Sequence, residues 1–191
     1  MGYCGAMRIK CPPRASLFLV PIAVLVLSAC ALAPPGPVGN SAVPQPAKPV
    51  DLQRYAGIWF EMGRYEASFQ RGCEAVTADY ALKVDGSVKV LNSCRQGAPD
   101  GPLKTATGRA KVVEGSQNAK LKVSFFGPFY GDYWILDHAD DYTWSIVGEP
   151  SGRYLWFLTR IANPSDTTRA TITNRARELG YNLQLVRPTQ H

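Results

Sequence analysis

Apolar and polar residues alternate along most of the chain after residue 51, which is the period-two pattern of strands with one buried face. Ser87-Val88-Lys89-Val90 and Lys120-Leu121-Lys122-Val123 are clear examples. Asp85-Gly86 separates two such segments, and both residues accept the positive φ angles of a tight hairpin turn. The pattern predicts strands over 56–66, 74–83, 87–94, 105–113, 119–125, 131–138, 142–148 and 153–160.

A helical period appears only after the last of these strands. Ser165 can cap a helix that Gly180 can end, and the residues of its buried face are Ile172, Ala176 and Leu179. Residues 183–186 then predict a short final strand. Eight sequential strands before one helix favour an all-β fold, an eight-stranded antiparallel up-and-down barrel whose interior can hold one small ligand. A β-sandwich fits the number of strands almost as well.

The first 29 residues follow a different pattern. Three basic residues and no acidic one precede an apolar run over 15–29, which is shorter than the roughly 20 residues of a membrane-spanning helix. This pattern predicts a signal peptide over 1–29. Leu27-Ser28-Ala29-Cys30 resembles the lipobox of bacterial lipoproteins, which implies that Cys30 carries a lipid. Ordinary cleavage beside an incidental cysteine is the alternative.

Residues 30–50 contain six prolines among small residues. Such a segment cannot form a core and favours an extended polyproline conformation. It therefore predicts a spacer between Cys30 and a single barrel domain over 51–191, reaching up to ~60 Å at about 3.1 Å per residue.

Removal of the predicted signal lowers the net charge. The full chain has 21 basic and 15 acidic residues; three basic residues leave with the signal, so the remaining chain has a net charge of +3. It contains no Lys/Arg cluster that would indicate a nucleic-acid partner. A zinc site would need more ligands than His138, His191 and the cysteines supply, and the sequence indicates no metal and no cofactor.

The five cysteines differ in their expected fates. Cys4 and Cys11 belong to the signal, Cys30 is the predicted lipid site, and Cys73 and Cys94 remain. An even pair in an oxidising periplasm predicts a disulfide, with two free thiols as the alternative. Closing a loop of roughly 20 residues would stabilise the fold by about 3 kcal/mol.

Three ordered segments resemble the lipocalin family. Tyr55-Ala56-Gly57-Ile58-Trp59-Phe60-Glu61 is similar to the Gly-x-Trp signature of the first lipocalin strand, and Tyr154-Leu155-Trp156-Phe157-Leu158-Thr159-Arg160 is similar to the last-strand signature. The segment 121–131 resembles the bacterial outer-membrane lipocalins, relatives of apolipoprotein D and the plant temperature-induced lipocalins. The resemblance covers 51–187. One departure is Ala139, which stands where the family has a second Asp, so that Asp140 or Asp141 would have to supply its contacts.

Strand direction in the barrel predicts how its closed end is built. Strand eight ends where strand one begins, so Arg160 can lie beside Trp59 and form a cation–π contact worth about 0.5–2 kcal/mol. The resemblance implies the same contact, as a plug that closes this end of the barrel. We interpret Trp59 and Arg160 as structural residues, with a ligand anchor as the alternative.

Side-chain alternation predicts the interior surface. Because Arg160 points inward, Leu158, Trp156 and Tyr154 share its face, and the same argument applies to the other strands. The predicted ligand-binding residues are Val76, Ala78, Tyr80, Val88, Val90, Ala110, Val123, Phe125, Tyr133, Ile135, Tyr154, Trp156 and Leu158. This apolar and aromatic wall suits an acyl chain whose polar end lies near the mouth. A solidly packed barrel is the alternative.

The opposite end of the barrel is expected to be open. Its rim is predicted to consist of the loops 67–73, 95–104, 126–131 and 149–152, with Cys73 and Cys94 beside them. Phe126, Phe129 and Tyr130 make one of these loops aromatic. Contact with a membrane, a cover over the ligand, a homodimer contact and an apolar loop folded over the barrel edge all fit this composition.

The resemblance implies a non-enzymatic carrier of fatty acids or lysophospholipids, involved in membrane upkeep under stress. Its acyl anchor at Cys30 would hold it at the outer membrane, because Ala31 is not the Asp that often retains lipoproteins at the inner membrane. A catalytic lipocalin of the isomerase or epoxidase type is the alternative, although no nucleophile–base set emerges from the spacing. Glu61 is a candidate buried carboxyl, more typical of a structural hydrogen bond. A surface protein that binds a macromolecule through its mouth loops is a third hypothesis.

Overall fold

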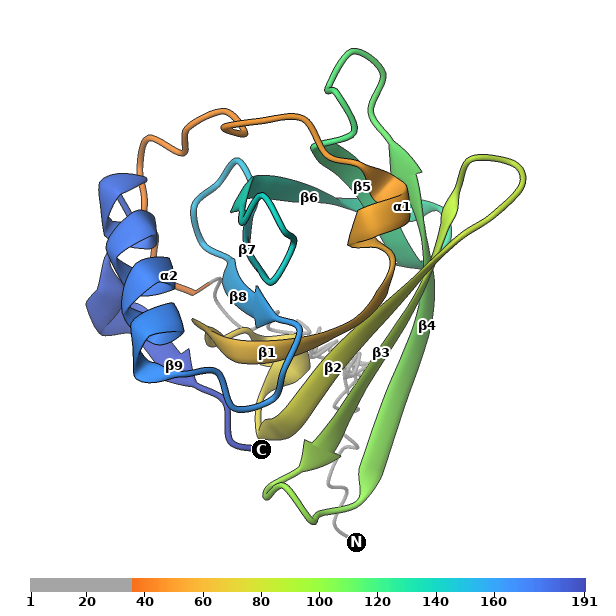
Figure 1. Ribbon diagram of the computed structural model, residues 1–191. Coiled ribbons are helices and arrows are strands. Elements are labelled where there is room, and N and C mark those ends of the chain that lie inside the picture. Colours follow the sequence, from red (N-terminus) through yellow and green to blue (C-terminus); the bar gives the residue numbers. More distant parts are fainter. Residues whose placement is uncertain (1–35) are drawn as a thin grey trace, which may run out of the picture. The chain divides into compact units, whose positions relative to one another are not determined.

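Figure 1 shows a computed structural model of the chain, which describes residues 36–191. The predicted signal peptide over 1–29 and Cys30 lie outside the described residues. None of the helices within 36–191 is long and apolar enough to cross a membrane.

The strands form one antiparallel sheet that closes on itself. The strand β1 (Gly57–Tyr65) pairs with β2 (Cys73–Leu82) on one side and with β8 (Leu155–Thr159) on the other. Between them lie β3 (Val88–Gln96), β4 (Leu103–Val112), β5 (Lys120–Phe126), β6 (Phe129–His138) and β7 (Trp144–Gly148). Each pairs with its neighbours in the sequence. The predicted eight-stranded up-and-down barrel is confirmed, and the β-sandwich is wrong.

Two α-helices flank the barrel. The helix α1 (Leu52–Tyr55) precedes β1, and the Asp51 side chain caps it by accepting from the backbone N–H groups of Gln53 and Arg54. The helix α2 (Asp166–Glu178) follows β8 and is capped by Ser165, as its sequence predicts. Two 3-10 turns, η1 (Ser68–Gln70) and η2 (Leu183–Leu185), complete the helical elements, and the final strand β9 (Val186–Pro188) begins later than predicted.

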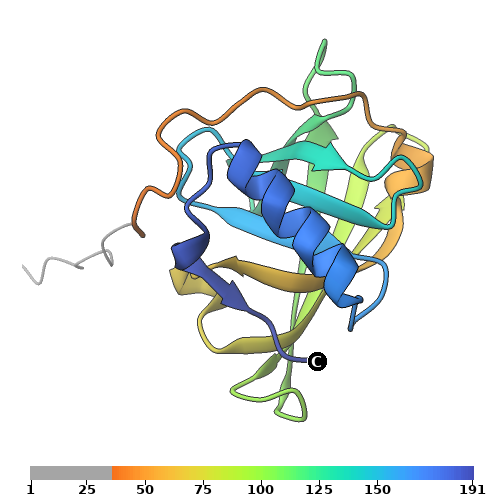
Figure 2. The ribbon, with the colours of Figure 1, turned by 60° about the vertical axis from the view of Figure 1, so that its left-hand side comes forward.

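The barrel wall separates two hydrophobic cores. The inner core includes Trp59, Val90 and Leu158. The outer core includes residues of α2, the helix that Figure 2 shows lying against the outside of the barrel. Ile172 and Ala176 of α2 are fully buried in the outer core. Because β8 has an apolar layer on each face, its sequence Leu155-Trp156-Phe157-Leu158 is continuously apolar instead of alternating.

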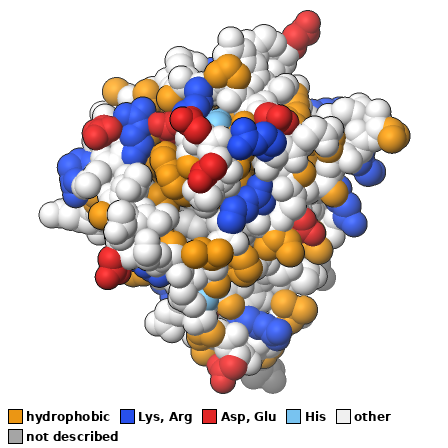
Figure 3. Space-filling model, viewed as in Figure 1, with side chains coloured by type: hydrophobic (Ala, Val, Ile, Leu, Met, Phe, Trp, Pro, Cys, Tyr) orange, Lys and Arg blue, Asp and Glu red, His pale blue; other side chains and the backbone are white. Residues whose placement is uncertain are grey.

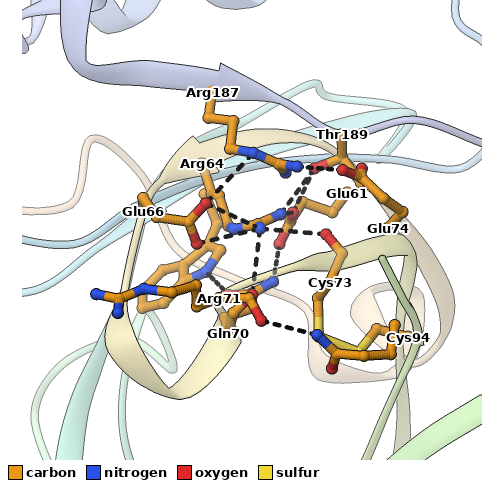
Figure 4. Close-up of a disulfide and its surroundings, with 12 residues drawn as sticks. Glu61, Arg64, Glu66, Gln70, Arg71, Cys73, Glu74, Cys94, Arg187 and Thr189 are labelled. Atoms are coloured by element: carbon orange, nitrogen blue, oxygen red, sulfur yellow. Dashed lines mark hydrogen bonds and ion pairs between the residues drawn. A yellow bond between two sulfur atoms is a disulfide. The ribbon is translucent and has the colours of Figure 1, made fainter. Parts of the chain in front are cut away.

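The second half of β1 pairs with β9 instead of β2. Residues 57–60 pair with β2, but Gly63, Arg64 and Tyr65 pair with β9. At the open end the C-terminal residues therefore occupy a seam between β1 and β2. Residues of both strands and of β9 meet there, as Figure 4 shows.

A buried arginine fills this seam. The Arg64 side chain is fully buried and donates to a Glu61 carboxylate oxygen at 2.7 Å and to the carbonyl oxygen of Cys73 at 3.1 Å. Gln70 and Thr189 also donate to Glu61. Since an unpaired buried charge costs about 3–5 kcal/mol, the seam requires both members of the pair.

Residues 36–50 do not form the free spacer that their prolines predict. Backbone N–H groups of this segment donate to carbonyl oxygens of the barrel, from Gly39 to Gly152 at 2.9 Å, from Ala47 to Leu136 at 2.8 Å and from Val50 to Gln117 at 3.0 Å. An extended chain leaves its own backbone groups unpaired, so they can bond to a neighbouring surface. The segment lies along the outside of the barrel, from the 149–152 loop to α1 (Figures 1 and 2).

The contribution of the seam to stability can be tested by lowering the pH. Burial alone would raise the pKa of Glu74, but hydrogen bonds from the Gln190 backbone and from Arg187 hold it below the ordinary glutamate value. A carboxyl with a lowered folded-state pKa stabilises the fold above its unfolded pKa of about 4.3, and this stabilisation is lost as the pH falls through the folded-state pKa. We expect the free energy of urea unfolding to fall between pH 5 and pH 3, and to fall less in Glu74→Gln.

Glu114→Gln is the matched control, because Glu114 is exposed and has no ion pair among the described residues. This variant should keep the wild-type pH dependence. An identical slope in wild type and Glu74→Gln would contradict the role of the seam.

Candidate functional site: an open cavity inside the barrel

The barrel encloses a cavity of about 1000 Å³, which opens where β2 begins and β3 ends. This volume is at the upper end of the range for small-molecule pockets, about 300–1000 Å³. The interior is therefore not packed solid, and that alternative from the sequence is wrong.

Side-chain alternation places most of the predicted residues on the cavity wall. The predicted residues that line it are Val76, Ala78, Tyr80, Val88, Val90, Ala110, Val123, Phe125, Tyr133, Tyr154, Trp156 and Leu158. Ile135 is the exception: it is 1% exposed and belongs to the inner core, and it is not part of the wall. The wall is mainly apolar, which favours an apolar ligand.

The sequence does not reveal the polar residues of the cavity wall. Toward the mouth these are Ser93, Lys104, Thr105, Asp132 and Glu149. Asn92 lies deeper, because its partner Ala78 also pairs with Trp59, and its buried Oδ1 has no hydrogen-bond partner among the described residues. Neighbouring residues such as Asn92 and Ser93 both reach the lining, which a strict period of two does not allow. In β2, a bulge between Glu74 and Thr77, with Ala75 at a φ of 44°, brings both Val76 and Thr77 to the cavity.

The disulfide between Cys73 and Cys94 is present, with 5.4 Å between the Cα atoms. It joins the start of β2 to the end of β3 at the open end, so the rim is covalently fixed there. Around the same opening, Phe69, Phe126 and Phe129 each expose more than half of their side-chain surface. Exposed aromatic groups at a cavity entrance are typical of an interaction surface.

The wall and the seam are connected through Trp156. Its indole N–H donates to the Gln70 side-chain oxygen at 3.0 Å, and the Gln70 amide donates to Glu61. Glu61 lines the cavity but is engaged by Arg64, Gln70 and Thr189. Its surroundings are those of a structural carboxylate.

The closed end is formed by Trp59 and Arg160. The Trp59 ring is fully buried, and the Arg160 guanidinium carbon lies 3.7 Å from the ring centroid. The same guanidinium donates to the carbonyl oxygens of Arg54 at 2.7 Å and Ile58 at 2.8 Å. It thus links α1 and β1 at the closed end.

A chain of four hydroxyl groups lies above this plug, at the cavity floor. The Tyr80 hydroxyl is 2.9 Å from that of Tyr133, which is 3.1 Å from that of Tyr55. Tyr55 in turn contacts the Ser145 hydroxyl at 3.1 Å, and Ser145 donates to the carbonyl oxygen of Asp137. Burial raises the pKa of Tyr55 to about 12 and raises those of Tyr80 and Tyr133 as well, so the phenols are protonated at neutral pH.

Ala139 has no polar side chain, and the acidic residues around it form the polar contacts of the 137–142 turn. Asp137 pairs with Arg175 at 2.6 Å, Asp140 pairs with Lys48 at 2.8 Å, and the Thr143 backbone and hydroxyl donate to Asp141. The two ion pairs line a pocket of about 410 Å³ outside the barrel. Figure 3 shows basic and acidic side chains interspersed on the face viewed in Figure 1. Among residues 36–191 no group of three His, Cys, Asp or Glu side chains could hold a metal ion.

A closed antiparallel barrel with one closed end and an apolar interior cavity defines the class of small single-chain barrels that enclose a ligand. Residues 50–191 match the model of the lipocalin-like domain, and the chain belongs to this family.

Several proteins are similar to the chain. It is 41% identical over 126 residues to the outer membrane lipoprotein Blc of Vibrio cholerae, covering 64% of this chain and 73% of that protein. It is 37% identical to Blc of Escherichia coli K12 (70% and 75% covered) and 32% identical to temperature-induced lipocalin-1 of Arabidopsis thaliana (74% and 80% covered). In fold it resembles insecticyanin of the tobacco hornworm, with a TM-score of 0.64, 17% identity and coverage of 82% and 87%.

The plug predicts a large effect of one substitution. Trp59→Ala removes a fully buried ring and the face on which Arg160 packs, so we expect a loss of about 3–5 kcal/mol in the free energy of urea unfolding. Arg160→Met keeps part of the packing and should cost less. A Trp59→Ala protein as stable as wild type would contradict the structural interpretation.

Proposed function

We propose that this lipocalin carries or stores fatty acids and lysophospholipids at the bacterial outer membrane, without catalysing a reaction on them. The observation that carries the proposal is the open cavity of about 1000 Å³, whose wall is mainly apolar and whose mouth has polar residues. Burial of an acyl chain in such a cavity is favourable by about 0.8 kcal/mol of transfer free energy for each methylene group removed from water. The polar head of the same ligand would remain near Lys104 and its neighbours at the mouth.

The carboxyl groups at the cavity support binding without catalysis. Glu61 is engaged by Arg64, Gln70 and Thr189, and Glu149 accepts hydrogen bonds from Ser151 and from backbone groups of its own loop. Asp132, the third carboxylate of the wall, pairs with Lys122 at 2.7 Å. A general base must be within reach of the proton that it removes, and all three carboxylates are engaged by other groups of the protein.

Sequence and relatives support the location. The relatives from Vibrio cholerae and Escherichia coli are named outer membrane lipoproteins. In this chain, Cys30 follows a signal-like segment and is followed by Ala31. We infer that Cys30 is lipidated and that the anchor holds the barrel at the outer membrane, on its periplasmic face. The exposed Phe126 and Phe129 would be the first groups at the mouth to meet an incoming lipid.

The carrier function is tested with the chain from residue 31 onward, which contains the compact unit Ala33–His191. We expect its organic extract to contain acyl lipids by mass spectrometry. After delipidation, hexadecanoic acid and a lysophospholipid should quench its tryptophan fluorescence, because Trp156 lines the cavity. An empty barrel that neither ligand quenches would refute the proposal.

Trp156→Ala should weaken the binding of both ligands, measured by calorimetry, while the barrel remains folded by circular dichroism. Trp144→Phe is the control, because Trp144 packs against the outer core and should leave ligand affinity unchanged. Equal affinities of Trp156→Ala and wild type would show that the ligand binds elsewhere.

The anchor is tested separately in the full-length chain. Cys30→Ser removes the thiol that would receive the lipid, so we expect the protein to move from the membrane fraction to the soluble periplasmic fraction. Its purified barrel should keep the affinity for hexadecanoic acid. A Cys30→Ser protein that stays in the outer membrane fraction would contradict lipidation as the anchor.

A further inference from the structure

The floor of the cavity has a polar feature that a purely acyl ligand would not use. Tyr55, Tyr80 and Tyr133 all line the cavity, and their hydroxyl groups form the chain that continues to Ser145. The floor is otherwise apolar and is formed by residues such as Leu52 and Leu82. Asn92, the next polar side chain, lies on β3 two positions nearer the mouth than Val90, the partner of Tyr80.

The terminal member of the chain is Tyr80. Its hydroxyl has one hydrogen-bond partner among the described residues, Tyr133, whereas the hydroxyls of Tyr133 and Tyr55 each have two. A phenol has one proton to donate and can also accept, so Tyr80 keeps capacity for another partner. The cavity offers room for that partner, because Tyr80 lines the cavity while its ring packs against the inner core.

The chain can present either polarity to a ligand. When every proton points toward Asp137, the Tyr80 oxygen accepts from a ligand; when the protons of the tyrosines and Ser145 point the other way, Tyr80 donates. A hydroxyl or carbonyl oxygen fits such a site in one or both of these arrangements.

A carboxylate does not fit the floor. The nearest cation at the closed end is Arg160, whose guanidinium lies on the Trp59 ring and donates to backbone carbonyl groups. A carboxylate taken to the floor would lose its water without gaining a cation, which is costly. A neutral oxygen group needs only the hydrogen bond.

We propose that the hydroxyl chain is a second, deep polar subsite, which selects amphiphiles with a neutral oxygen at the end of the chain that enters first. The ligand class is then a long-chain acid or lysolipid with a hydroxyl or keto group near its distal end. This proposal deepens the carrier function and rests on it.

Three acids of equal chain length test the subsite: hexadecanoic acid, 16-hydroxyhexadecanoic acid and 2-hydroxyhexadecanoic acid. The last is the positional control, because its hydroxyl lies beside the carboxyl. We expect calorimetry on the chain from residue 31 onward to show that the 16-hydroxy acid binds about five- to tenfold more tightly than the other two, the effect of one uncharged hydrogen bond.

Tyr80→Phe removes only the terminal hydroxyl and leaves the other three paired, so it should abolish this preference while retaining affinity for hexadecanoic acid. Tyr133→Phe, which interrupts the chain, should reduce the preference as well. Tyr65→Phe is the matched control, because Tyr65 belongs to the outer core and donates to Asn182.

The outcomes separate the two proposals. If hexadecanoic acid binds but the 16-hydroxy acid has no advantage, or keeps its advantage in Tyr80→Phe, the floor subsite is wrong and the carrier function stands. If wild type binds none of the three acids, both proposals fail.

Discussion

The closure of the sheet through β1 is the constraint on which the rest of the molecule depends. Residues 57–60 of this strand bond to β2, and residues 60–64 bond to β8. The first and last strands of the barrel therefore pair with each other, and their backbone groups are not left exposed at sheet edges. Closing eight strands fixes the width of the barrel. Small residues such as Ala78 and Ala110 do not fill that width, and the cavity follows from the geometry of closure combined with the size of the wall residues.

Closure also leaves a gap in the wall. Where β1 and β2 separate at the open end, backbone groups and charges would be left without partners, and the pair of Arg64 and Glu61 fills that gap together with the C-terminal residues. Through Gln70 the same network holds the Trp156 indole in place. A side chain that lines the cavity is therefore oriented by the element that closes the barrel.

The sequence predicts those features of the fold and of the cavity wall that depend on local periodicity. Alternation along single strands is sufficient to place Tyr80, Val90 and Trp156 on the cavity wall. It fails for Ile135, because depth along the barrel is not encoded in a period of two. The hydroxyl chain joins residues as distant as Tyr55 and Ser145, and the four-residue α1 is too short to show a period, so neither is visible before the fold is known. The proline content of 36–50 describes the intrinsic preference of the segment but not the barrel surface that binds it.

The docking of residues 36–50 has a consequence for orientation. The segment leaves α1 at the closed end and follows the barrel to the open end, where Arg153 and Gly152 contact Gly36 and Gly39. The described chain thus begins beside the mouth, six positions after Cys30, a distance of about 20 Å at full extension. If Cys30 carries a lipid, the entrance of the barrel would stay within this reach of the attachment point. The effective concentration of membrane lipid at the mouth would then be set by the length of this short tether.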